Sequence, residues 1–111
     1  MEKIYQQALL YDFYGELLTE HQRSVYEMSI NDDLSLSEIA DALSISRQGV
    51  HDLLKRCDHQ LQDYEARLHL VEKFLNIREG VIRINKLTAK DADNDTLAEI
   101  SRLSSLILEE L

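Results

Sequence analysis

The chain of 111 residues has no proline, no tryptophan, three glycines and one cysteine. Proline and glycine interrupt helices and mark tight turns, so their scarcity favours long helices over a many-turned sheet. The single cysteine, Cys57, excludes an internal disulfide, and the amino terminus lacks the basic and then apolar layout of a secretion signal. No apolar run approaches the roughly 20 residues that span a bilayer. We therefore expect a soluble, all-α protein of the cytoplasm.

The sequence also lacks the patterns that carry most catalytic and metal sites. It has no glycine-rich phosphate loop and no nucleophile with a matching base. The acidic segment 91–95 is similar to the start of a calcium loop, but Thr96 and Arg102 stand where that loop requires Gly and Glu. Cys57 and His59 are two residues apart on a predicted helix and so point in different directions. We expect a non-enzymatic protein without a cofactor or metal.

The most specific pattern in the chain is the apolar spacing of residues 35–54. Ile39 and Leu43 are four residues apart, and Val50 and Leu53 are three apart. Each pair places one apolar stripe on a short helix, so two such helices can bury their stripes against each other. The spacing predicts a helix-turn-helix, with an ordinary helical hairpin as the alternative.

Three residues of this segment have predicted roles at the turn and the crossing. Ala40 is the small residue that lets the two helix axes approach, and Ile45 is expected to fill the turn. Ser44 stands where this motif commonly carries glycine, because the turn visits the left-handed region of backbone space.

Local capping signals mark where helices begin. A Ser or Thr followed three residues later by Glu or Gln forms a capping box, which satisfies free N–H groups at a helix start. These boxes are Thr19 with Gln22, Ser35 with Glu38, and Thr96 with Glu99. Ser46 is expected to cap the second helix of the motif, with Ile45 and Val50 in contact across that cap.

Further helices are predicted on both sides of the motif. The segment 2–18 has an inner face expected to include Ile4, Leu9, Leu17 and Leu18, and a second helix follows it up to the break at 31–33. The first segment carries most of the aromatic residues, which we expect in the core, with an exposed contact surface as the alternative. The aromatic residues concerned are Tyr5, Tyr11, Phe13 and Tyr14.

The carboxyl-terminal part is predicted to be a helical extension. We divide the chain into a helix-turn-helix domain, 1–64, and an extension, 65–111. The extension begins with a long helix over 65–87, with a possible kink at Gly80, and ends with a helix whose apolar stripe is wider than a lone surface helix needs. That stripe could pack on the long helix or on a second subunit, which would make a homodimer. The stripe contains Leu97, Ile100, Leu103, Ser104, Leu106, Ile107, Leu108 and Leu111.

Charge is distributed unevenly along the acidic chain, whose net charge is −9. Residues 46–59 carry three basic against two acidic side chains, whereas the segments before and after them are acidic. The candidate nucleic-acid-binding residues are Ser46, Arg47, Gln48, His51, Lys55 and Arg56. In the extension, basic residues could follow a nucleic-acid backbone if they form one row, with a solvated face as the alternative. That row would contain Arg67, Lys73, Arg78, Arg83, Lys86 and Lys90.

These motifs carry a resemblance to known families. The segments 18–23, 34–40 and 45–50 resemble region 4 of bacterial sigma factors, and together with 46–65 and the helical tail they resemble the YlxM family more closely. The resemblance implies a small cytosolic protein that assists or regulates the signal recognition particle pathway, through the particle's RNA or its GTPase subunit.

Three functional hypotheses follow, all non-enzymatic. The first is an accessory of the signal recognition particle that binds its RNA or GTPase subunit through the second motif helix. The second is a dimeric DNA-binding regulator, in which Arg47, Gln48 and His51 reach base edges while Lys55 and Arg56 hold phosphate. The third is an adaptor that uses the motif to grip another protein. One excess positive charge predicts weak and salt-sensitive binding by a monomer.

Overall fold

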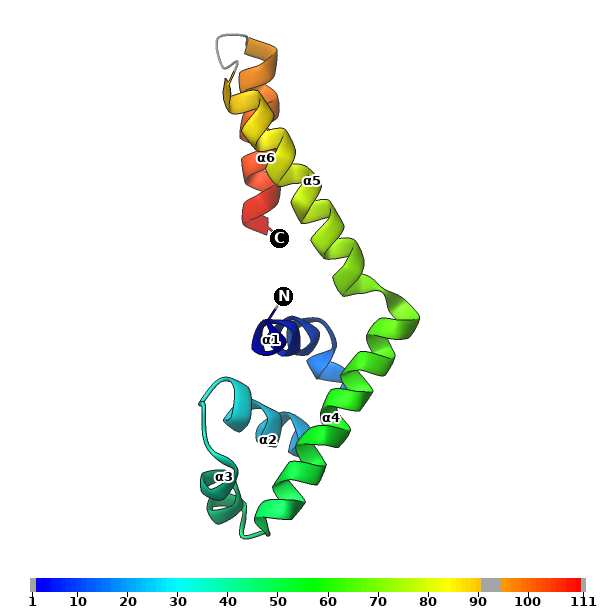
Figure 1. Ribbon diagram of the computed structural model, residues 1–111. Coiled ribbons are helices and arrows are strands. Elements are labelled where there is room, and N and C mark those ends of the chain that lie inside the picture. Colours follow the sequence, from blue (N-terminus) through cyan, green and yellow to red (C-terminus); the bar gives the residue numbers. More distant parts are fainter. Residues whose placement is uncertain (1, 91–94, 111) are drawn as a thin grey trace. The chain divides into compact units, whose positions relative to one another are not determined.

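The computed structural model describes residues 2–90 and 95–110, and within them it contains helices and no strand, which confirms the all-α prediction. Two compact units are present, Met1–Val71 and Glu72–Leu111. The domain division predicted after residue 64 falls inside a helix and stays a prediction. The helices are α1 (Lys3–Tyr14), the short 3-10 helix η1 (Gly15–Leu17), α2 (Glu20–Ile30), α3 (Leu36–Leu43), α4 (Arg47–Leu68), α5 (Leu70–Lys90) and α6 (Asp95–Glu110) (Figure 1).

The predicted helix-turn-helix is formed by α3 and the first turns of α4 (Figure 1). Val25 from α2, Ile39 and Ala40 from α3, and Val50 from α4 form its buried cluster. Leucines and a methionine from all three helices pack around this cluster at half-buried positions. The predicted inward stripes and the small residue at the crossing are therefore confirmed.

The prediction for Ile45 is wrong. Its side chain is 41% exposed and lies outside the cluster, near Gly49 at the start of α4. Leu43 on α3 and Leu53 on α4 already pack against the cluster on either side of the turn. The wedge between the helices is thus filled without the residue in the turn.

Hydrogen bonds at the helix starts match two of the three predicted capping boxes. Both are complete, with the Ser or Thr oxygen accepting from the backbone N–H three residues on and the Glu or Gln side chain accepting in return. Ser46 caps α4, because its Oγ accepts from the Gly49 N–H at 2.9 Å. The third box is wrong, since α6 begins at Asp95, which places Thr96 inside the helix, and Glu99 accepts from Arg102 instead.

Ser44 ends α3 in the left-handed region, with φ 58° and ψ 41°, as the sequence predicts. A side chain costs energy in this conformation, whereas glycine adopts it freely. We expect Ser44→Gly to raise the free energy of unfolding by about 1 kcal/mol, measured by urea denaturation. Ser24→Gly, at an exposed helical position in α2, is the control and should lower stability. Equal losses for both variants would contradict a strained turn.

Ala40 offers a second test of the crossing, since its side chain is buried between helices while Ala42, on the same helix, is exposed. Ala40→Leu should overpack the crossing and lower the free energy of unfolding by about 1–3 kcal/mol. Ala42→Leu adds the same atoms on the solvent side and should stay close to the parent. A parent-like urea midpoint for Ala40→Leu would mean that the two helices do not approach closely at this residue.

Tyrosines join α1 and α2 to α4. The Tyr26 hydroxyl donates to Asp58 Oδ1, and Gln7 Nε2 donates to Asp58 Oδ2 at 3.1 Å. Tyr14 is 1% exposed, and Tyr11 stacks on Tyr26 with ring centroids 5.4 Å apart. Among the predicted aromatic residues, the core interpretation is confirmed for Tyr14, whereas Tyr11 is half-buried.

The predicted inner face of the first segment holds only in part. Leu9 and Leu18 are buried, whereas Ile4 is 71% and Leu17 is 55% exposed, and Tyr5 is exposed as well. The segment is not one helix to residue 18: α1 ends at Tyr14 and a short 3-10 turn follows. The turn changes the direction of the chain, so a face extrapolated with one helical period is lost after α1.

The pKa values of Tyr11, Tyr14 and Tyr26 predict a loss of stability at alkaline pH. Burial, followed by a hydrogen bond to a carboxylate, raises the pKa of Tyr11 to about 12 and also raises the pKa values of Tyr14 and Tyr26. The folded state therefore keeps protons that the unfolded chain releases near pH 10. This contribution to stability is complete below about pH 10 and is lost as the pH rises through the folded values. Urea midpoints measured from about pH 8 to about pH 12 should fall above about pH 10, and less steeply for Tyr26→Phe.

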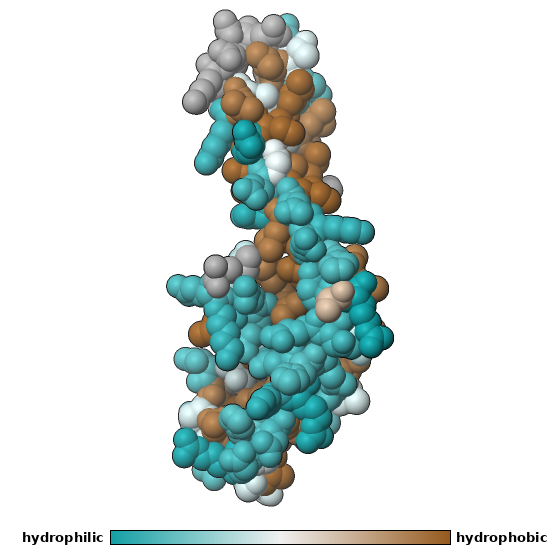
Figure 2. All heavy atoms as spheres, turned by 45° about the vertical axis from the view of Figure 1, so that its right-hand side comes forward, coloured by the Kyte–Doolittle hydropathy of each residue, from teal (hydrophilic) through white to brown (hydrophobic). Residues whose placement is uncertain are grey.

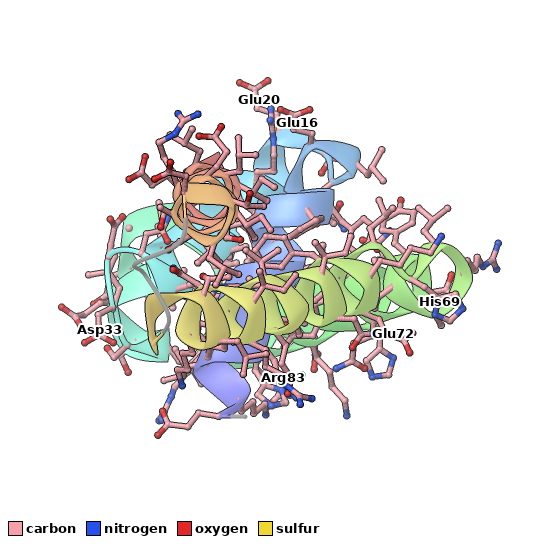
Figure 3. All side chains as sticks on the ribbon, turned by 90° about the horizontal axis from the view of Figure 1, so that it is seen from above. Glu16, Glu20, Asp33, His69, Glu72 and Arg83 are labelled. Carbon is pink, nitrogen blue, oxygen red and sulfur yellow. The ribbon has the colours of Figure 1, made fainter. Side chains whose placement is uncertain are left out.

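The long helix predicted over 65–87 is displaced. The motif helix α4 continues to Leu68, and the break lies at His69, whose φ is 55°. The start of α5 is held by side chains of the first unit: Tyr14 Oη accepts from the Leu70 N–H at 3.1 Å, and Glu65 Oε1 accepts from the Val71 N–H at 3.0 Å. Figure 3 shows His69 and Glu72 close to this break. Side chains distant in sequence therefore fix a break that the local pattern does not mark.

The second unit is a helical hairpin of α5 and α6 (Figure 1). Helix α5 passes through Gly80 without interruption. Asn85 joins the two helices, since its Nδ2 donates to Ser105 Oγ and its Oδ1 accepts from Ser101 Oγ, both at 3.3 Å. None of the described helices has the length and apolar character needed to cross a membrane.

Candidate nucleic-acid interface

The predicted binding residues lie at the start of α4, on the side that faces away from the buried cluster. Val50 points into that cluster and is fully buried, while Leu53 and Leu54 pack against it. All six predicted residues are exposed. Because Arg47, His51 and Lys55 are four residues apart, they form one row along the exposed side of the helix. The packing of the motif therefore presents this row to solvent.

Three of the six residues have partners within the same segment. Ser46 caps α4, so its main contribution is to fix where the helix begins. Gln48 Nε2 donates to Asp52 Oδ1 at 3.0 Å, and His51 Nδ1 lies 3.6 Å from the same oxygen. A nucleic acid that is read by Gln48 must therefore compete with Asp52 for that N–H group, and Asp52 also places a carboxylate beside His51.

Arg47, Lys55 and Arg56, the cations in the first half of α4, are in a different situation. Within the residues that the structure describes, no ion pair involves Arg47, Lys55 or Arg56. By contrast, Arg67 pairs with Asp63 at 3.3 Å in the last turns of α4. The cations near the start of α4 can therefore meet a polyanion without first breaking an ion pair to a described residue.

Shallow depressions surround these cations. Leu36 of α3 lines one of them together with Arg47, Gln48 and His51. Lys55 lines two more: one with Arg56, Asp52 and His59, and one against residues of α1, including Lys3. The depressions are open to solvent, which suits contact with an extended backbone better than enclosure of a small molecule.

Two basic or titratable residues beside this surface, Lys3 and His59, were not among the predicted binding residues. His59 lies four residues after Lys55, so helical spacing alone could have included it. Lys3 comes from α1, and only the packing of α1 against α4 brings it near Lys55. No local signal in the sequence predicts that approach.

Asp58 is acidic but belongs to the interior side of this region. It accepts hydrogen bonds from Tyr26 and Gln7, so it holds α4 against α1 and α2.

Cys57, beside it, is fully buried, and burial raises the pKa of its thiol to about 11. A thiol that stays protonated is a poor nucleophile, which leaves the cysteine as a packing residue.

The basic row predicted along the extension is not a single face. Arg67 lies on α4, before the break at His69, and the others lie on α5. Lys73, Arg78 and Arg83 are five residues apart, which rotates each about 140° from the last on a helix of 3.6 residues per turn. Arg83 points away from α6 in Figure 3. Lys73 and Arg78 therefore lie on different sides of α5, whereas Arg83 and Lys86 are about 60° apart. The predicted set does not form one continuous row, which favours the alternative of a solvated face.

Metal ligands do not cluster in the part of the chain that the structure describes. There, no group of three or more His, Cys, Asp or Glu side chains is arranged to hold a metal ion. The segment 91–94, which contains most of the calcium-like acidic pattern, lies outside the described residues.

Comparison with known proteins agrees with the motif. The family described as "Putative helix-turn-helix protein, YlxM / p13 like" (UPF0122) matches residues 1–101. A UPF0122 protein of Clostridium botulinum is 52% identical over 109 residues, covering 96% of this chain and all of the relative. A UPF0122 protein of Clostridium kluyveri is 44% identical over 90% of this chain and 93% of its own length. A third, from Acetivibrio thermocellus, is 48% identical over 78% of this chain and 74% of its own length. The chain therefore belongs to the UPF0122 family of YlxM/p13-like helix-turn-helix proteins.

Proposed function

We propose that this chain is a non-enzymatic regulatory protein that binds nucleic acid through the exposed side of α4. The observation that carries the proposal is the exposed group of Arg47, Lys55 and Arg56 on the second helix of a helix-turn-helix. Helices in this position enter grooves or lie along phosphate backbones, where Arg and Lys supply most of the affinity. Ser46, Gln48 and His51 complete the proposed surface.

The RNA of the signal recognition particle is the first candidate ligand. This choice rests on the resemblance to the YlxM family, which implies a role in that pathway through its RNA or its GTPase subunit. The net charge of −9 supports a selective contact over general adhesion to nucleic acid, because the acidic remainder of the chain repels phosphate.

Duplex DNA is the second candidate, and the helix-turn-helix geometry favours it. In that case Arg47, Gln48 and His51 read base edges in the major groove, and a homodimer reads two half-sites about one helical turn apart. A monomer has few cations on this surface, so its binding would be weak at physiological salt. Dimerisation would double the number of cations in contact with the DNA.

A three-way binding assay tests the proposal. Fluorescence anisotropy compares labelled particle RNA, random duplex DNA of matched length and the purified GTPase subunit, at about 0.15 M salt. Binding to either nucleic acid with a negative salt slope supports the proposed surface, and the preferred ligand separates the two candidates. Binding to the GTPase subunit alone would overturn nucleic-acid binding and favour an adaptor.

A further inference from the structure

The hairpin of α5 and α6 carries an apolar face that no described part of this unit covers. Within the described residues of this unit, seven large aliphatic side chains are 39–62% exposed. Hydrophobic side chains gather along one side of this unit in the upper part of Figure 2. The face consists of Ile77, Ile84, Leu87, Ile100, Leu103 and Ile107.

Polar side chains occupy the contact between the two helices instead. Thr88 and Ser104 are the residues of this unit that the structure describes as buried, each 6% exposed. Asn85 hydrogen-bonds to Ser101 and Ser105 across the hairpin. The hairpin therefore buries Thr88 and Ser104 and leaves residues such as Ile82 and Leu97 half-buried, while a further set of large aliphatic side chains stays exposed. A self-sufficient unit usually covers such side chains.

The apolar residues on each helix are spaced for packing against another helix. On α5 the spacing alternates between three and four residues, through Ile77, Gly80, Ile84 and Leu87. On α6 it alternates in the same way, through Ile100, Leu103 and Ile107. Such steps form the a and d positions of a heptad, which insert into the side-chain pattern of a facing helix.

Both stripes lie on the same side of the hairpin. On each helix, the residues that contact the other helix and the apolar stripe are separated by roughly a quarter turn about the helix axis. Followed along the chain direction, this rotation has the same sense on α5 and on α6. Since α5 and α6 run antiparallel (Figure 1), equal rotations bring the two stripes to one side. The unit thus offers a pair of parallel apolar ridges, which fits a second pair of helices better than a single peptide.

We infer that this apolar face packs against the same face of a second copy of the chain, giving a two-fold symmetric four-helix bundle. The inference deepens the dimer included in the proposed function by naming its interface, and it does not depend on nucleic-acid binding.

Size and charge favour a second copy. The unit has about 40 residues, a length at which a chain usually needs a disulfide, a metal or association to hold a core. It has no cysteine, and six basic against eight acidic residues leave it at −2, compared with −7 for residues 1–71. The six side chains expose roughly 600 Å² per copy, so two copies could bury roughly 1,200 Å² in total. That area is at the lower limit for specific protein–protein interfaces.

Sedimentation equilibrium of the full chain, without nucleic acid, tests the inference. At about 10 μM we expect twice the chain mass of 12.9 kDa. Ile84→Lys with Leu103→Lys places charges inside the proposed interface and should weaken association at least about a hundredfold. The matched control, Ile4→Lys with Leu17→Lys, changes two exposed aliphatic residues of the other unit and should leave the dimer intact.

A second double variant with glutamates in place of the lysines distinguishes a disrupted interface from a misfolded chain. A chain with Ile84→Glu and Leu103→Glu should also be monomeric, and mixing it with the lysine variant should restore a dimer if both chains remain folded by circular dichroism. A monomeric parent, or a dimer lost only in the control variant, would overturn the inference. Because no nucleic acid is present, failure here leaves the proposed function to be judged by its own assay.

Discussion

Replacing Ile39 with alanine should lower the free energy of unfolding by about 2–5 kcal/mol, the largest stability loss that we expect from a single truncation in this chain. Ile39 is fully buried where α3 meets α4, in contact with the cluster that includes Val25 and Val50. Truncation removes the transfer energy of the lost carbons and leaves a cavity in a close-packed region. Urea denaturation followed by circular dichroism measures the change.

Ile45→Ala is the matched control, with the same atoms removed from the same motif. Ile45 is 41% exposed and lies outside the cluster, so its truncation should cost less than about 1 kcal/mol. Similar losses for the two variants would mean that the turn, and not the crossing, holds the motif together.

This pair also shows what the sequence can and cannot predict. Helical spacing correctly placed Ile39 and Val50 inward, because a stripe on a regular helix has only one side to bury. It misplaced Ile45, because this residue lies in the turn between two helices, where the helical period does not apply. There, the packing of neighbouring side chains determines whether a residue is buried. Ser44 was predictable because its conformation follows from local sterics.

Errors beyond the motif have the same cause. The chain breaks at His69 because Tyr14 and Glu65 accept hydrogen bonds from the first N–H groups of α5, and Tyr14 is more than fifty residues away in sequence. The capping box at Thr96 fits the sequence pattern, but α6 starts one residue earlier and Glu99 pairs with Arg102. A contact between distant residues therefore fixes the first of these boundaries, whereas at α6 a neighbouring arginine takes the glutamate that the capping box needs.

The exposure of the candidate site was predictable from the sequence, whereas its neighbours on other helices were not. Six exposed residues at the start of α4 follow from the motif, whereas the approach of Lys3 to Lys55 depends on how α1 packs. The hydrogen bond from Gln48 to Asp52 was accessible to reasoning, because the two residues are four apart on a helix.

Reversing the charges of Lys55 and Arg56 should weaken nucleic-acid binding by about a hundredfold. Both side chains are exposed, and no ion pair within the described residues holds either one. A hydrogen bond between charged groups contributes about 1.5–3 kcal/mol, so the loss of two contacts accounts for that factor. The slope of log K against log salt should also become shallower by about 1.8 for duplex DNA, or about 1.4 for single-stranded RNA.

The control is a second double reversal, Arg83→Glu with Lys86→Glu, which changes the net charge by the same amount on α5. Both residues are exposed, and Arg83 points away from α6 in Figure 3. If binding depends on the cations of α4, the control loses little affinity and keeps its salt slope, because Arg83 and Lys86 do not belong to the proposed surface. Equal losses in both variants would show that net charge alone governs the interaction, and an unchanged slope in the α4 variant would remove Lys55 and Arg56 from the interface.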